Sequence, residues 1–149
     1  MADNTLHPSI LLIWTLANRS ACLSGSERIQ PVYFLLACLE VMDDAYQPEA
    51  SQMGFDAEAI EAIRLNAAEC RELSGLSTEE LTKVRRTLRR TLLEGATPLS
   101  MQMLHRSDES RSLFNQAARR AANQGDPELT ITHVFHLLLL LLLMLLVCT

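Results

Sequence analysis

Residues 17 to 39 read ANRSACLSGSERIQPVYFLLACL, and this stretch predicts the fold. Small or apolar residues recur in it at every fourth position, at Ala17, Ala21, Gly25 and Ile29. The same pattern returns one hundred residues later without a gap, at Ala117, Ala121, Gly125 and Leu129. An internal repeat of this kind means that one structural unit is built twice. We therefore predict two copies of a helix-turn-helix unit.

Each copy carries the signals of two packed helices. Alanines four residues apart share one helical face and let a neighbouring helix approach closely. The glycine that follows them suits the left-handed residue that closes a helix. The second helix of the first copy is predicted to begin at Pro31, because proline is favoured in the first helical turn. In the second copy, Thr130 or Thr132 is the candidate cap.

Further helices are predicted outside the repeated stretches. One should run from Pro8 to Ser24, and another should begin after the cap residue Asp56 and reach residue 73. Ser77 followed by Glu80 forms a capping box, which predicts a helix that extends to residue 94. We also predict a short helical piece around residues 101 to 105. The sequence as a whole predicts an all-α protein, a compact bundle of six to eight helices.

Composition limits the class of protein. With 149 residues, of which 48% are hydrophobic and only five are glycine and five proline, the chain suits one compact helical domain. The net charge of −5 argues against a dedicated nucleic-acid binder. The four cysteines have no C-x-x-C spacing, and we expect them to be buried free thiols of a cytoplasmic protein.

The repeated pattern resembles the Clp repeat, two copies of which make the N-terminal domain of Clp-type AAA+ unfoldases and disaggregases. In addition, residues 53 to 57 resemble the family's Leu-Gly-Val-Asp step into its third helix. The resemblance implies one Clp N-terminal-like domain over residues 1–149, built from two helix pairs related by a pseudo-twofold axis. Repeat 1 would cover about residues 6–73, an enlarged connecting segment 74–106, and repeat 2 residues 107–149. Val32 and Tyr33 depart from the family's usual Glu-His.

The function that this resemblance implies is non-catalytic binding of proteins or peptides. Such a module recognises a substrate or an adaptor for a Clp-type AAA+ chaperone or unfoldase. The pseudo-twofold arrangement implies two related apolar grooves, one near the first helix of each repeat. We expect Leu6, His7 and Ile10 to line them and Arg86 and Arg90 to form an electrostatic rim.

Residues 137 to 147 form an uninterrupted apolar run near the end of the sequence. Eleven residues are too few for a transmembrane helix, which needs about 20. The repeat alignment puts this run in the position of the predicted core helix at residues 34 to 41, and we expect it to be a buried core helix. The alternative is that one side is exposed and forms a homodimer. The chain would then be a standalone regulatory or structural protein that self-associates through this leucine-rich helix.

Charge is distributed unevenly, with acids concentrated in residues 40 to 80 and bases in residues 81 to 120. The densest basic segment is residues 83 to 90, where Arg86 and Arg90 share one helical face and Arg85 and Arg89 share another. A solvated helix face is the simpler interpretation. The alternative is a docking stripe for an acidic partner. Nucleic acid is disfavoured because no aromatic residue lies among these bases.

No catalytic pattern is present. The sequence lacks G-x-x-x-x-G-K-[ST], G-x-S-x-G and H-E-x-x-H. His133 and His136 have a spacing that metal ligands use, but no acid or thiol is placed beside them, so we expect structural histidines. We therefore predict a protein that is not an enzyme and needs no cofactor or metal ion.

Overall fold

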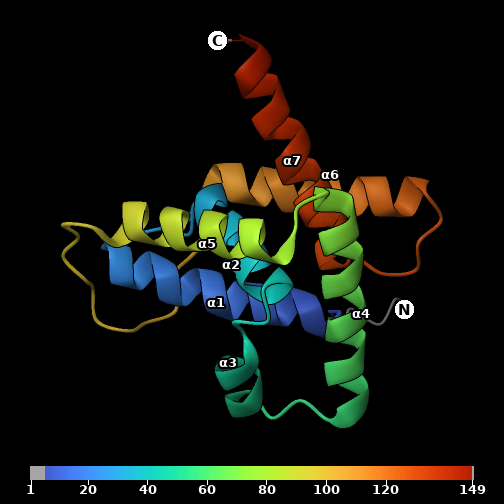
Figure 1. Cartoon of the computed structure of the whole chain (residues 1–149), viewed down its shortest axis with the longest axis horizontal. Coiled ribbons are helices and arrows are strands. Elements are labelled where there is room, and N and C mark those ends of the chain that lie inside the picture. The colour runs from blue at the N-terminus through green and yellow to red at the C-terminus, as the bar shows by residue number, and fades with distance from the viewer. Residues whose placement is uncertain (1–5, 149) are drawn as a thin grey trace.

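The computed structural model describes residues 6–148, and in this range every regular element is a helix (Figure 1). The all-α prediction is confirmed, and the number of helices lies within the predicted six to eight. The helices are α1 (Pro8–Ser24), α2 (Pro31–Met42), α3 (Gln47–Gln52), α4 (Ala57–Ser74), α5 (Thr78–Leu93), α6 (Asp108–Asn123) and α7 (Ile131–Cys148).

The two repeats have the same backbone geometry at the turn. Gly25 has φ of 80° and Gly125 has φ of 77°, so both adopt the left-handed conformation. In each copy the residue after the glycine donates a backbone hydrogen bond of 2.9 Å to the alanine five positions earlier, from Ser26 to Ala21 and from Asp126 to Ala121. This bond satisfies a helix-end carbonyl that would otherwise have no partner. The repeat seen in the sequence is therefore a repeat of local structure.

The predicted helix starts are also found. Asp56 caps α4 by accepting the backbone N–H of Ala59 at 2.8 Å. Ser77 caps α5 with the complete capping box, in which Ser77 and Glu80 each accept the other's backbone N–H. Because such caps are local, the sequence alone places both helices correctly.

The core lies where the two helix pairs meet. α1 packs against α2, α6 packs against α7, and α4 packs against both α1 and α7. Figure 1 shows α7 crossing α6 at a steep angle. Ala17 and Ala117 are fully buried, as the close-approach prediction requires. Phe34 of α2 meets Phe114 of α6 edge to face, with ring centroids 4.8 Å apart. This aromatic contact joins the two repeats.

Residues 94 to 107 form an extended strap across α1, and the short helix predicted at residues 101 to 105 is wrong. The side chain of Asn18, which is 6% exposed, donates to the carbonyl of Gln102 and accepts the N–H of Leu104, both at 2.8 Å. The backbone of the strap also pairs with Ile29 in an isolated parallel bridge to Arg106. These long-range bonds satisfy the strap's polar groups and replace helical ones.

The strap passes directly over the turn of the first repeat. A Cβ atom placed on Gly25 would lie 2.5 Å from the carbonyl oxygen of Thr97, whereas one on Gly125 would meet nothing within 4 Å. Gly25 is therefore required by both its backbone conformation and its neighbour, and Gly125 by its conformation alone.

The leucine run is buried only in its first part, and the prediction that all of it is core is wrong. Leu137 and Leu138 are buried, but residues 141 to 147 are 40 to 85% exposed. In the repeat, Met42, where α2 ends, corresponds to Leu142, and α7 continues past this point because it has no capping or turn residue there. The distal part therefore projects from the body (Figure 1). No helix in the described part of the chain is both long and apolar enough to cross a membrane.

Candidate functional site

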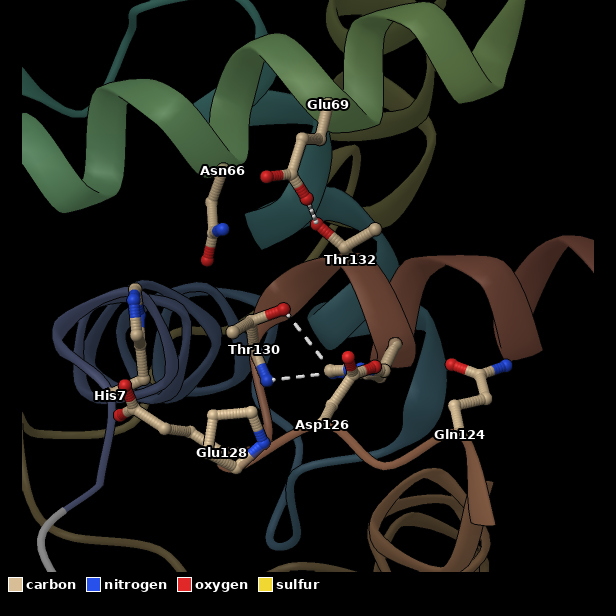
Figure 2. A pocket seen from close by; sticks show the side chains of 10 residues that line it. His7, Asn66, Glu69, Gln124, Asp126, Glu128, Thr130 and Thr132 are labelled. Atoms are coloured by element: carbon tan, nitrogen blue, oxygen red, sulfur yellow. Dashed lines mark hydrogen bonds and ion pairs between the residues drawn. The ribbon is translucent and has the colours of Figure 1, made fainter. Parts of the chain in front are cut away.

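Two of the recesses formed by the described residues have opposite character. The first, called the polar pocket here, opens where the start of α1 meets α4 and the loop before α7 (Figure 2). Its volume is about 300 Å³. Glu69, Asp126 and Glu128 line it, and no lysine or arginine does. Burial lowers the pKa of His7 in its wall, although Glu128 and Glu69 act in the opposite direction. The pocket is therefore negatively charged.

His133 closes the start of α7 beside this pocket. Its Nδ1 accepts the backbone N–H of Thr130 at 2.9 Å, which leaves the ring proton on Nε2 for the Asp126 carboxylate at 2.7 Å. The Thr130 hydroxyl lies 3.2 Å from the same Nδ1, so a hydroxyl, an imidazole and a carboxylate stand in line. Because Nδ1 already accepts the amide proton, it is not placed to activate the hydroxyl as a general base. This arrangement is a helix cap.

The polar pocket is also tied together by hydrogen bonds within the fold. The hydroxyl of Thr132 donates to the Glu69 carboxylate at 3.0 Å, a bond that joins α7 to α4 (Figure 2). Ser9, which is fully buried, donates to the Asn66 side chain at 2.8 Å and joins α1 to α4. The polar side chains of the pocket therefore serve to hold three helices together.

The second recess, called the apolar groove here, lies between α2, α5 and α7 and has a volume of about 550 Å³. No charged side chain lines it. Leu35 and Leu39 of α2 contribute to it alongside residues of α5 on one side and α7 on the other. Its lining is Leu35, Leu39, Ser74, Leu76, Val84, Thr87, Leu88, Thr91, Phe135, Leu139 and Leu142. An uncharged groove of this size suits an apolar peptide segment.

The α5 side of this groove follows a regular pattern. Val84, Thr87, Leu88 and Thr91 have the i, i+3, i+4, i+7 spacing of a single helical face. This face lies beside the buried one that begins at Leu81. The sequence contains this i, i+3, i+4, i+7 spacing, but the predicted binding residues on this helix were arginines of its charged face instead.

The four arginines of α5 divide into two pairs with different roles. Arg85 donates from Nε to Asp43 at 2.5 Å, and Arg89 lies 3.4 Å from Glu40, so both are held by acids of α2 or its C-terminal cap. Burial raises the pKa of Glu40, although Arg89 counteracts this effect. Arg86 and Arg90 are exposed, and neither has an ion pair within residues 6–148. Only this second pair is available to a partner.

The structure separates the five residues that the sequence proposed as a binding site. Leu6 is exposed, and His7 lines the polar pocket. Ile10 is 1% exposed, so the prediction that it lines a groove is wrong: its position in α1 faces the core. Arg86 and Arg90 line neither recess. Since successive helical residues are about 100° apart, Arg86 faces away from the groove and Arg90 lies about a third of a turn from the middle of the groove face.

Three cysteines of the described residues lie in the interior. Cys22, Cys38 and Cys70 are free and buried, as predicted for these three. Burial raises the pKa of Cys70 to about 12, which makes its thiol a poor nucleophile. Among the described residues, no three His, Cys, Asp or Glu side chains gather in a way that would hold a metal ion.

Comparison with protein-family models, with curated proteins and with solved structures finds nothing that matches this chain.

Proposed function

We propose that this chain is a non-catalytic protein-binding module whose apolar groove receives an apolar peptide segment or a short helix of a partner. The observation that carries the proposal is the groove itself, a 550 Å³ recess between α2, α5 and α7 with no charged lining residue. A helix presenting side chains at i, i+3, i+4 and i+7 buries one apolar face in such a groove. Exposed Arg90, about a third of a turn around α5 from the middle of the groove face, favours a partner with an acid beside its apolar face.

The repeated helix pairs suggest the class of partner. On their resemblance to the Clp repeat, the module recognises a substrate or an adaptor for a Clp-type AAA+ chaperone or unfoldase and acts in the cytoplasm. The groove is placed differently from the sites that the resemblance implied, because it is built on α5, within the enlarged connecting segment. Recognition in this chain would therefore depend on the segment that departs most from the repeat.

Direct binding to an unfolded protein tests the groove. Fluorescein-labelled, reduced casein serves as the probe, and its anisotropy is followed while the chain is titrated. Val84→Glu places a charge in the groove wall at a side chain that is 43% exposed, so the fold should tolerate it. We expect the affinity to fall at least about 10-fold, which corresponds to about 1.4 kcal/mol.

Leu65→Glu is the matched control, because Leu65 is 52% exposed on α4 and lies outside the groove. Equal losses for both variants would show that general surface apolarity binds casein, and would refute the groove as the site. The class of partner is tested separately with the immobilised chain in a lysate of the source organism. Capture of a AAA+ unfoldase or its adaptor by the wild type but not by Val84→Glu supports the Clp assignment.

A further inference from the structure

The distal part of α7 is a helix without a polar side. Residues 141 to 147, named the leucine tip here, are all exposed, whichever side of the helix they occupy. α7 contains no Asp, Glu, Lys or Arg from end to end. A helix that is apolar all round is normally buried on several sides, and an exposed patch of this size marks an interaction site. One flat contact would leave much of the tip in water.

The apolar groove is suited to a helix of this kind. α2 lies beneath it, α5 on one side and the base of α7 on the other, so a helix lying in it would be covered on three sides. The groove and the tip are parts of one apolar surface, since Leu142 belongs both to the groove wall and to the tip. Each copy of the chain therefore carries both a three-sided groove and a helix in need of one.

We propose that two copies pair through α7, with the leucine tip of each lying in the apolar groove of the other. The two α7 helices would run antiparallel, so that the base of one helix, at Leu139, lies beside the tip of its partner, near residue 146. This register places the twofold axis near Leu142. A closed, self-complementary contact of this type is the commonest form of a homodimer.

The surface available is sufficient for such a dimer. A fully buried aromatic side chain removes about 150–250 Å² from water, and a leucine somewhat less. The seven tip residues are 40 to 85% exposed, so together they present on the order of 600 Å² of apolar surface in each copy. The groove lining adds to this on both copies. The total exceeds the roughly 1,200 Å² at which stable, specific interfaces begin. Neither surface carries a charge of its own, although Leu141 at the base of the tip shares a recess with Asp108 and Glu109.

Pairing would also regulate binding. The inference rests on the groove of the proposed function, because the partner's tip and a client peptide would occupy the same space. The dimer would hold the groove closed, and the client would bind only to the monomer. Client affinity should then fall as the concentration of the chain rises.

The test uses charge at the twofold axis. Leu142→Glu and Leu142→Lys each place two like charges face to face in the dimer, whereas a mixture of the two variants pairs opposite charges. Sedimentation equilibrium is measured from about 1 to 100 μM, with circular dichroism as the check on folding. We expect the wild type to be a dimer, and each variant alone to dissociate at least about 100-fold more easily. The equimolar mixture should dimerise again.

Leu65→Glu should stay dimeric and is the control for added charge. A wild-type monomer over the whole range overturns the proposal, as does a mixture that stays monomeric. If the wild type is a monomer and sediments together with phosphatidylcholine vesicles, the tip would instead bind a lipid surface. That result would also overturn the dimer proposal. The casein assay distinguishes the two ideas with Leu145→Lys, a substitution in the tip at a side chain that is 65% exposed and lies outside the groove lining. If this variant is monomeric and binds casein, the groove stands. If the wild type dimerises but neither it nor the monomeric variant binds casein, only the proposed function fails.

Discussion

Replacing Asn18 with alanine should loosen the strap on α1, although the bond from the N–H of Leu99 to the carbonyl of Cys22 remains. The substitution removes two hydrogen bonds of 2.8 Å, one to the carbonyl of Gln102 and one from the N–H of Leu104. Each bond contributes about 0.5–1.5 kcal/mol net. Gln102 is exposed, so water can satisfy its carbonyl, but Leu104 is only partly exposed and its N–H would lose its partner. We expect the free energy of unfolding to fall by about 2–3 kcal/mol.

Urea denaturation followed by circular dichroism measures this loss, and thermal unfolding should show a midpoint lower by about 5–10 °C. Asn115→Ala is the matched control, since Asn115 is exposed on α6 and has no side-chain hydrogen bond to another described residue. If Asn18→Ala destabilises the chain no more than the control does, the two bonds do not hold the strap. The explanation given for its extended form would then be refuted.

Three further substitutions test particular contacts. Gly25→Ala should destabilise the chain by at least about 1–2 kcal/mol more than Gly125→Ala, because both strain a left-handed turn but only the first meets the strap; equal urea midpoints would contradict this. Arg85→Ala should cost about 1–3 kcal/mol, since Asp43 loses its charged partner and keeps the hydroxyl of Thr82, whereas Arg86→Ala should stay within about 0.5 kcal/mol of the wild type. With its pKa raised to about 12, Cys70 should react with iodoacetamide at pH 8 on the order of 10³-fold more slowly than a free cysteine. Peptide mass spectrometry after timed labelling measures that rate, and fast labelling of the folded chain would show that the helix opens.

The helices and their ends could be predicted because their signals are local. Pro8, Pro31, Asp56 and Ser77 mark helix starts through the geometry of one turn, and each start lies where the sequence placed it. The strap could not be predicted in this way. Its form depends on Asn18, more than eighty residues away, whose side chain bonds to its backbone. Residues with weak helical preference adopt whichever arrangement satisfies their polar groups.

The position of the candidate site was missed for a related reason. The sequence divides the arginines of α5 between two helical faces, but it could not show that Asp43 and Glu40 bind one of these pairs, because only the fold brings the acids close. The groove requires three helices that are distant in the sequence, so periodicity in α5 alone could show an apolar face without showing what faces it.

The repeat also explains why the groove and the leucine tip occur together. In the first repeat, α5 packs against α2, and the chain turns away at Asp44, which has φ of 56°. In the second repeat, α7 has no such stop, and no described helix covers its distal part as α5 covers α2. The same departure from symmetry thus leaves one side of the groove open and extends an apolar helix beyond the core. A second copy of the chain is the simplest cover for the open groove and for the exposed part of α7, since that copy supplies a helix of the same apolar character.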